Sequence, residues 1–381
     1  MSVTDLMSKE RRGSTAAYLV LAVIAVFGLV LGIIRLVQGL GATTNLNDGY
    51  PWGLWIAFDF FAVPFSAGAF TLALVTQIFN RKAYSGIAHL ALLAGFLGYT
   101  MVILVLLLDI GRWDQFYSVL LPWRWNLHSF MFEVSMSITL YFGVLMLELL
   151  PIVFGDRDWV AVQIVDRLIV LVAAVGILLS TVHQGSIGAI FLILSHRLQA
   201  LWWTPILPVL FLTSALFSGL SVSILLGILT WRALKRPVPM KLLSGLAKGA
   251  AALLVFYLVL KVGDLLLAGE LDLIFNSGGF SFVWLVEVII GVIVPLVIFA
   301  SRARESEDGL LVGSICVLVG LAINRATQAW FALDAPPGHS YTPHWIEYAI
   351  PLAAAAAGIL FYSLGIRRLQ GLRQPILEDG H

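Results

Sequence analysis

Charged residues are scarce in this sequence: Asp, Glu, Lys and Arg make up 12% of its 381 residues, whereas 60% are hydrophobic. So little polar surface excludes a water-soluble globular protein and predicts an integral membrane protein. Cysteine is scarcer still, and the single Cys316 excludes an intrachain disulfide, a cysteine-ligated iron–sulfur cluster and a cysteine-based zinc site. The formal net charge of +1 gives no basic patch for nucleic acid.

Apolar runs of about 20 residues or more predict about ten transmembrane helices, and therefore an all-α polytopic membrane protein. The first run is too long for a signal-peptide core of about 7 to 15 residues, and no small-residue cleavage motif follows it. We therefore expect it to remain as a helix. The predicted spans are residues 15–40, 52–79, 85–110, 127–152, 160–193, 203–231, 242–268, 281–301, 308–333 and 345–369.

Lysine and arginine are unevenly divided between the two sets of predicted loops. Of the 23, fifteen lie on one side, three lie on the other and five lie within spans (15 + 3 + 5 = 23). Because cytoplasmic loops carry the excess of Lys and Arg, this count predicts that both termini of the multi-pass protein are cytoplasmic. The opposite loops are rich in Trp, Tyr, Pro and Gly, as an interfacial belt or a docking surface would be.

Several carboxylates and one histidine stand inside apolar segments at a similar predicted depth. At about 1.5 Å per residue, Asp59 lies roughly 10 Å from the outer end of its span. Asp109, Glu133 and His183 lie in the outer parts of the next three spans. A helix-packing hydrogen bond is an equal alternative for each alone. Four such groups in one layer favour a proton, ion or substrate site, because charges in a bilayer are costly.

Polar positions recur after about four helices. The motif at residues 65–68 (FSAG) matches residues 217–220 (FSGL), Asp109 matches Asp264, and Glu133 matches Glu287, with offsets of 152, 155 and 154 residues. A shift of four helices preserves orientation, so the pattern predicts two parallel-related four-helix bundles. The predicted parts are a tail at 1–14, a helix at 15–40, bundles at 41–193 and 203–333, a last helix at 345–369 and a tail at 370–381.

The two predicted bundles differ in their charges. In the second, Lys261 lies three residues from Asp264 on one helix face, and Arg325 stands where the first has His183. Permanent cations indicate a neutralised, structural copy, whereas a histidine can change protonation near neutral pH. We therefore place the reactive site in the first bundle and predict a structural charge network of Lys261, Asp264, Glu287, Arg325 and Glu347.

Glu133 and Glu148 stand 15 residues apart in one predicted span. They are separated by roughly 22 Å and project within about 60° of each other on a helix. The spacing favours a proton path with Tyr141 between them, although a headgroup-facing Glu148 is an equal alternative. Tyr99 is a further candidate, although packing is the commoner role of a membrane tyrosine. Hydroxyls that could contribute are Ser135, Ser137 and Thr139.

A resemblance to a known family rests on six strings: NLNDGYPWGLWIAFD (45–59), LLLDIGRW (106–113), FMFEVSMSITLYFGVLMLELLP (130–151), TVHQGSIGA (181–189), INRATQAW (323–330) and YTPHWIEY (341–348). Together they resemble the NrfD/PsrC (polysulfide reductase membrane subunit) superfamily, and most of all the HybB-type membrane subunit of periplasmic nickel-iron hydrogenases. The resemblance covers all ten predicted spans.

The resemblance implies a haem-free membrane anchor of a respiratory oxidoreductase complex, which is not catalytic alone. It would exchange electrons and protons between a quinone, either menaquinone or ubiquinone, and a periplasmic iron–sulfur (ferredoxin-like) subunit. That subunit would join a catalytic or multihaem cytochrome subunit, and proton translocation is a further expectation. No haem or iron–sulfur cluster is expected in this chain. The implied quinone-site and proton-path residues are Asp59, Asp109, Glu133, Glu148 and His183.

Further quinone-contact candidates are Tyr99, Arg112 and His128. Arg112 stands at the membrane edge, where it could partly balance Asp109, and His128 could be a ligand, a quinone contact or an interfacial residue. A quinone that takes two electrons also takes two protons, so a donor such as His183 and a carboxylate relay suit its reduction.

Two other functional classes remain open. A cytochrome b needs paired axial ligands, and His128 with His183 is the only pair in the outer layer, since His89 lies nearer the cytoplasmic side. A secondary transporter would also show repeats and intramembrane charges, but it would favour broken helices at a midplane site.

Overall fold

The computed structural model describes residues 3–366 apart from 156, 195 and 335, and over these residues the chain is a bundle of helices without a β-strand. Ten helices or helix runs are long and apolar enough to cross a membrane. The predicted all-α fold with about ten spans is therefore confirmed. The predicted tail at 370–381 lies outside the described residues.

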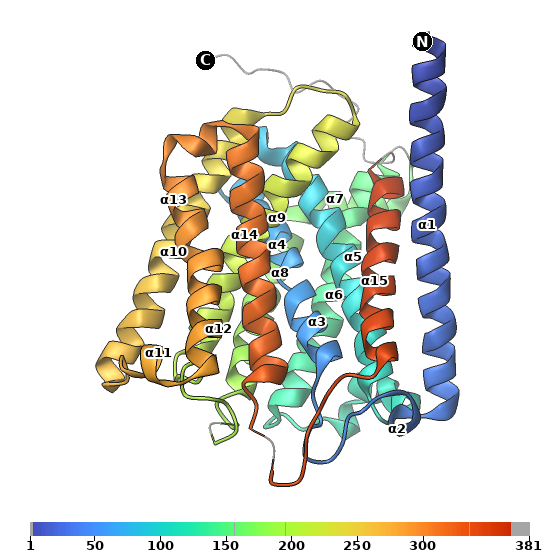
Figure 1. Cartoon of the computed structure of the whole chain (residues 1–381). Helices are drawn as coiled ribbons and strands as arrows, with labels where there is room; N and C mark the ends of the chain where they lie inside the picture. The colour runs from blue at the N-terminus through green and yellow to red at the C-terminus, as the bar shows by residue number, and fades with distance from the viewer. Residues whose placement is uncertain (1–2, 156, 195, 335, 367–381) are drawn as a thin grey trace.

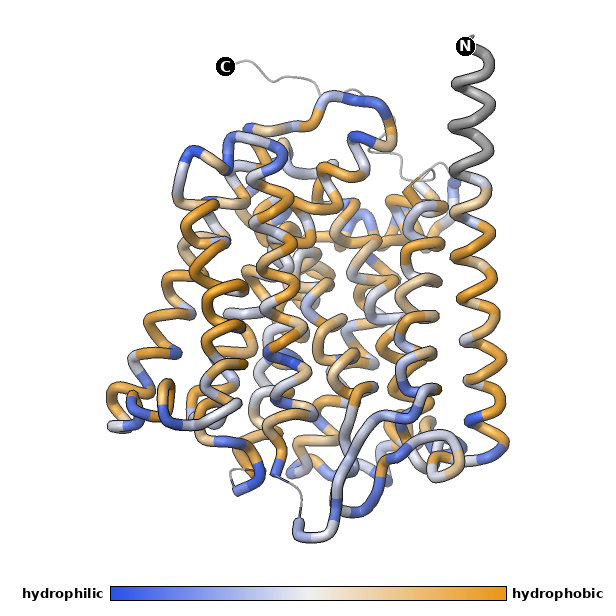
Figure 2. Tube along the Cα trace, in the orientation of Figure 1, coloured by the Kyte–Doolittle hydropathy of each residue, from blue (hydrophilic) through white to orange (hydrophobic). Residues whose placement is uncertain are grey.

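The spans are formed by the following elements in chain order: α1 (Val3–Gln38), α3 (Leu54–Ala62) with α4 (Phe65–Ala73) and the π-helical turn η1 (Leu74–Ile78), α5 (Ser85–Asp109), α6 (Phe130–Phe154), α8 (Ile169–Ile190), α9 (Leu207–Ala233), α10 (Met240–Ala268), α12 (Gly279–Val288) with η5 (Ile289–Ile293) and α13 (Val294–Ala300), α14 (Glu307–Ala326) with η7 (Thr327–Phe331), and α15 (Trp345–Gly365). Figure 2 shows orange, hydrophobic segments between two more polar ends of this bundle. We call the end where α1 begins the upper end, and the opposite end the lower end (Figure 1).

Two predicted spans depart from single straight helices. Pro64 has no backbone N–H to donate, and α3 ends two residues before it. The predicted span at 160–193 instead contains a short helix, α7 (Val160–Arg167), followed by the spanning α8. Val162 and Val165 of α7 are buried, whereas Arg167 at its end is exposed. The helix therefore has one apolar face, and the span begins nine residues later than predicted (169 − 160 = 9).

Side-chain caps fix several helix starts. Ser129 Oγ accepts a hydrogen bond from the backbone N–H of Phe132 at 3.3 Å, at the start of α6. At the start of α15, Glu347 Oε1 accepts from the backbone N–H of His344 at 2.8 Å. These oxygens satisfy N–H groups at the helix starts that lack intrahelical partners.

The spanning helices contact one another in two rings. Contacts run α4–α5, α5–α6, α6–α8 and α8–α4 in the first, and α9–α10, α10–α13, α13–α14 and α14–α9 in the second. The rings meet along α4 and α9, where a Cβ added to Gly219 would lie 2.2 Å from the Gly68 backbone nitrogen. Only glycine permits this approach. The predicted division into two bundles stays a prediction, and these are the contacts it requires.

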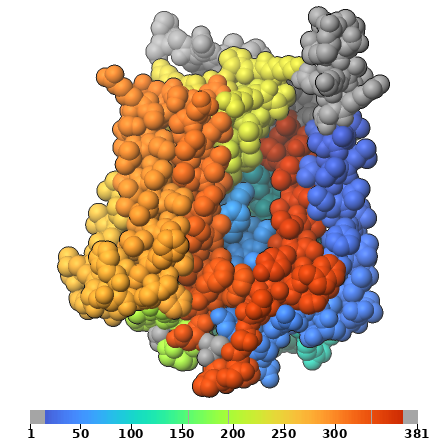
Figure 3. Space-filling view, in the orientation of Figure 1, coloured from blue at the N-terminus to red at the C-terminus, as the bar shows by residue number. Residues whose placement is uncertain are grey.

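Helices α1 and α15 pack against each other beside the first ring, where α15 also contacts α3 and α5. The two helices are antiparallel, since α1 begins and α15 ends at the upper end (Figure 1). Figure 3 shows this face hollowed between α14 and α15. The side of the membrane on which each end lies stays a prediction.

Candidate functional site

His183 lies in the interior of the first ring, on α8, with 0% of its surface exposed. Its ring nitrogen Nδ1 lies 2.9 Å from Ser137 Oγ on α6, and its ring centroid lies 5.7 Å from that of Tyr99 on α5. The other ring nitrogen, Nε2, has no hydrogen-bond partner among the described residues. A buried imidazole nitrogen of this kind can form a hydrogen bond with a ligand.

Polar side chains continue from His183 toward the upper end. The rings of Tyr99 and Tyr141 are both buried, and their centroids lie 5.0 Å apart. A Cβ added to Gly176 would lie 3.7 Å from the Tyr141 ring and 3.6 Å from Glu148 Oε1. Tyr141 and Glu148 therefore approach the same point of the α8 backbone, where Val144 Cγ1 would be the nearest neighbour of an added Cβ, at 3.0 Å.

Glu148 lines a cavity of about 510 Å³ near the upper end of the first ring. The carboxylate side chain is nevertheless only 7% exposed. A polar cavity of this size can hold several water molecules, which would connect Glu148 with the upper end. Other polar side chains in its lining are Thr76, Gln77, Ser85, His89 and Asp166.

Asp59 and Asp109 lie on α3 and α5, near α1 and α15. Asp59 is 4% exposed, and neither of its carboxylate oxygens has a hydrogen-bond partner within the described part of the chain. Asp109 Oδ1 is likewise buried without a hydrogen-bond partner within the described residues. Arg35 is buried on α1 and donates from Nη2 to the backbone oxygen of Ile110 at 2.9 Å. In the sequence, the one sign of this buried arginine was its position within a predicted span.

Arg112 and His128 lie outside this interior. The prediction that Arg112 balances Asp109 is wrong, because Arg112 forms an exposed ion pair with Asp114 at 3.4 Å. His128 is exposed in the loop before α6. The loop between α5 and α6 lies on the surface as short 3₁₀ segments, η3 (Trp113–Leu120) and η4 (Pro122–Arg124).

The four groups predicted to share one layer are instead spread along the helices. Tyr99, which contacts His183, is ten residues from Asp109 on α5 (109 − 99 = 10), or roughly 15 Å. Glu133 is exposed on α6, and its Oε1 accepts a hydrogen bond from Ser186 Oγ at 2.6 Å. The single layer is therefore wrong, and His183 stands deeper in the bundle than Asp109.

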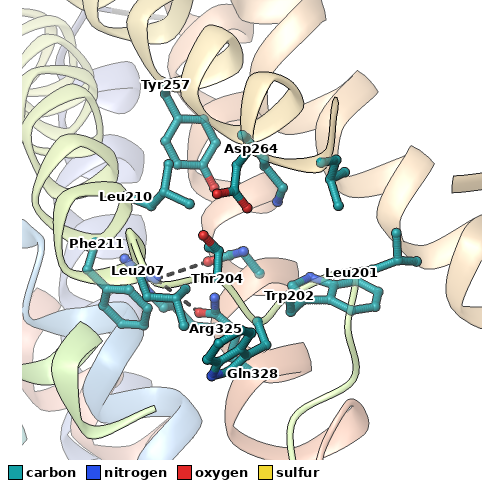
Figure 4. Close-up of a pocket in the computed structure, with 14 residues that line it drawn as sticks. Leu201, Trp202, Thr204, Leu207, Leu210, Phe211, Tyr257, Asp264, Arg325 and Gln328 are labelled. Atoms are coloured by element: carbon teal, nitrogen blue, oxygen red, sulfur yellow. Dashed lines mark hydrogen bonds between the residues drawn. The ribbon is translucent and has the colours of Figure 1, made fainter. Parts of the chain in front are cut away.

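A second polar cluster occupies the other ring. Glu287 on α12 is buried, forms an ion pair with Lys261, and accepts hydrogen bonds from Trp202 Nε1 at 2.7 Å and Asn324 Nδ2 at 3.0 Å. The predicted pairing of Lys261 with its own-helix neighbour Asp264 is not what the structure shows. Glu287 reaches Lys261 from a neighbouring helix, whereas Asp264 is half-buried and lines a cavity of about 20 Å³ (Figure 4).

Arg325 lies at the same cavity, and its partners are neutral. Its guanidinium donates to Asn324 Oδ1 at 3.0 Å and Gln328 Oε1 at 3.1 Å (Figure 4). The guanidinium also donates to Ser214 Oγ at 2.6 Å. It also stacks over the ring of Phe211, 3.7 Å from the centroid. Among the described residues, Asn324 is the hydrogen-bonded link between Arg325 and the Lys261–Glu287 ion pair.

Glu347, predicted within the same network, belongs elsewhere. It lies on α15, where Oε2 accepts a hydrogen bond from the Tyr341 hydroxyl at 2.5 Å and Oε1 accepts from the Asn45 backbone N–H at 2.9 Å. Burial, and then this contact with Glu347, raise the pKa of the Tyr341 phenol. Glu347 therefore fixes the lower-end loops against α15.

The described residues show no metal cluster, and the three histidines considered as haem ligands lie apart. The described residues include no group of three His, Cys, Asp or Glu side chains that could hold a metal. His89 and Tyr99 are ten residues apart on α5 (99 − 89 = 10), so His89 lies roughly 15 Å along the bundle from the Tyr99–His183 contact. His128 is exposed in a loop. No two of these histidines face each other as axial ligands would.

Comparison with known proteins gives consistent matches along the chain. Residues 42–327 match the family model described as polysulphide reductase, NrfD. A probable Ni/Fe-hydrogenase 2 b-type cytochrome subunit from Escherichia coli is 31% identical over 358 residues, 93% of this chain and 91% of the relative. A menaquinone reductase integral membrane subunit from Nitratidesulfovibrio vulgaris is 31% identical over 379 residues, 90% of this chain and 88% of the relative. An Hdr-like menaquinol oxidoreductase integral membrane subunit from Archaeoglobus fulgidus is 26% identical over 307 residues, 76% and 73% of the two chains.

Proposed function

Because the chain belongs to the NrfD family of polysulphide reductase membrane proteins, we propose that it is the quinone-reactive membrane subunit of a respiratory iron–sulfur oxidoreductase complex. Two relatives are named as integral membrane subunits of menaquinone or menaquinol enzymes. The ten apolar helices place the protein in a membrane. We assign that membrane to the bacterial cytoplasmic membrane, with the upper end facing the cytoplasm.

The quinone headgroup binds at His183. The observation that carries this proposal is the polar line from the Glu148 cavity through Tyr141 and Tyr99 to an imidazole nitrogen without a protein partner. Polar side chains in an apolar core cost stability, so such a line indicates a site for proton transfer or ligand binding. A quinone carbonyl or hydroxyl bonded to His183 would stand at the end of this line.

Protons reach the site from the upper-end cavity. Tyr141, Tyr99 and His183 are in successive ring contact, and Glu148 and Tyr141 both approach Gly176 of α8. Glu133 falls outside this route, since it is exposed on the outer surface of α6. The nearby Ser135 and Thr139 hydroxyls donate to backbone oxygens one turn earlier in their own helix, so they do not connect Glu133 with Glu148.

Electrons enter or leave through a partner, because one cysteine cannot hold an iron–sulfur cluster. We assign the partner to a periplasmic iron–sulfur subunit at the lower end, joined in turn to a catalytic or multihaem cytochrome subunit. Large exposed aromatic side chains gather in the lower-end loop between α5 and α6, where they provide contact area: Trp113, Phe116, Tyr117, Trp123 and Trp125.

The test uses the complex purified with its partner subunits and reconstituted in sealed vesicles. We expect His183→Asn to abolish quinone-linked turnover while the partner still reacts with artificial dyes. Glu148→Gln should suppress proton movement across the membrane during turnover. Asp264→Asn, in the other ring, is the matched control and should retain both activities. Normal quinone turnover in His183→Asn would refute the site.

The same experiment separates two other functions. A secondary transporter would be purified without an iron–sulfur subunit and would not turn over quinone. A cytochrome b would show the absorption bands of haem in the purified chain. The name of the Escherichia coli relative includes a b-type cytochrome, and the spectrum is therefore the test of the proposed absence of haem.

A further inference from the structure

Ser137 makes two contacts that together determine the tautomer of His183. Its Oγ lies 3.0 Å from the backbone oxygen of Val134 and 2.9 Å from His183 Nδ1. A serine hydroxyl has one hydrogen to donate, and a backbone carbonyl oxygen can only accept. Both contacts are hydrogen bonds only if Ser137 donates to Val134 and accepts from His183. Nδ1 must then carry the hydrogen.

We propose that Ser137 is a positioning residue that holds His183 as the Nδ1-protonated tautomer, with Nε2 as an acceptor. This inference rests on the proposed quinone site and specifies the form of its ligand. In a neutral imidazole one nitrogen donates and the other accepts. The buried Nε2 has no partner among the described residues, so the ligand that it takes is a hydroxyl donor.

The hydroquinone form has such a hydroxyl, whereas the quinone carbonyl can only accept. Hydroquinone therefore binds to the resting site in preference to quinone. For a quinone to bind through the same nitrogen, Nε2 must first gain a proton. Tyr99 is the titratable neighbour in contact with the ring, and its hydroxyl also lacks a partner within the described residues. The two-carbonyl and two-hydroxyl forms of one ligand are thus distinguished by a single serine.

The tautomer can be measured directly on the full-length chain in lipid nanodiscs. Selective ¹⁵N labelling of histidine gives separate resonances for protonated and unprotonated ring nitrogens, and His183→Asn identifies the relevant signals by their loss. We expect Nδ1 protonated and Nε2 unprotonated. Ser137→Ala should produce a mixture of tautomers, and Ser137→Thr, which keeps the hydroxyl, should restore the single form.

Ser135→Ala is the matched control on the same helix, because within the described part of the chain the Ser135 hydroxyl donates to the Met131 backbone oxygen and does not contact His183. It should leave the His183 signals unchanged. An Nε2-protonated ring in the wild-type chain, or identical spectra for wild type and Ser137→Ala, would overturn the assignment.

The ligand preference is measured with an alkyl-substituted naphthol and its methyl ether, which are redox-stable probes with and without a hydroxyl donor. Calorimetric titration should show the naphthol binding about three- to tenfold more tightly, as one net hydrogen bond allows. The ratio should fall toward one in Ser137→Ala and return in Ser137→Thr. An unchanged ratio in Ser137→Ala refutes the role of Ser137. Failure of both probes to bind the wild-type chain refutes the quinone site itself, while the spectra still report the tautomer.

Discussion

Removing the cation of the buried Lys261–Glu287 pair should destabilise the protein severely. Lys261→Met keeps the side-chain length but leaves Glu287 as an unpaired carboxylate with about 3% of its side chain exposed. Breaking a buried pair in this way costs about 3–5 kcal/mol. Hydrogen bonds from Trp202 and Asn324 remain, and they keep the expected loss toward the lower end of that range.

Removing both charges should cost much less than the two single changes together. Glu287→Gln leaves Lys261 buried without an anion, so alone it should also cost about 3 kcal/mol or more. In the double variant Lys261→Met/Glu287→Gln no unpaired charge remains, and the Gln carbonyl can still accept from Trp202. Replacement of a buried pair by neutral side chains is often close to neutral. We expect the double variant to recover at least 2 kcal/mol relative to the sum of the singles.

The free energy of unfolding would be measured by titration with denaturing detergent in mixed micelles, together with the yield of assembled complex. Asp264→Asn is the control, because Asp264 lies at the same cavity but is not the partner of Lys261, and it should lose less than about 1 kcal/mol. A loss below about 1 kcal/mol in Lys261→Met, or strict additivity in the double variant, would show that the pair is not a structural element.

Two further predictions concern packing and pH. Gly219→Ala would place a Cβ 2.2 Å from the Gly68 backbone nitrogen, so it should destabilise the protein by about 1–3 kcal/mol in a thermal unfolding assay. Gly143→Ala is the control and should be tolerated, because nothing lies within 4 Å of the added Cβ. Burial and then Glu347 raise the pKa of Tyr341. Its contribution to stability should therefore be complete below about pH 10 and fall at higher pH. Tyr341→Phe should abolish this pH dependence, and a pH profile of stability identical to that of the wild type would contradict the prediction.

The sequence was sufficient for the spans because long apolar runs fix helices by composition alone. It also located the charged residues of the second ring. The choice of Glu287 over Asp264 as the partner of Lys261 was not predictable, because the rotation of one helix against another depends on packing across the whole bundle. The roles predicted for the site residues stay predictions.

For the same reason, the sequence did not predict which residues of α6 face the interior of the ring. Glu133 and Glu148 do project within about 60° of each other by spacing, yet Glu133 is exposed and Glu148 is buried. The helix begins at the lower-end surface and enters the packed ring only further along. Arg35 was not predicted as a buried residue because α1 precedes the repeated pattern, so Arg35 has no matching position in a second bundle.

The close contact between Gly68 and Gly219 has a consequence for the symmetry of the two rings. At the repeat offset of 152 residues Gly219 matches Ala67, and a Cβ added to Gly219 would lie 2.9 Å from the Ala67 Cβ. Residues that touch their own counterparts lie on a rotation axis, as in an isologous dimer. The predicted repeat would therefore set a pseudo-two-fold axis at this contact, running along the membrane normal between α4 and α9.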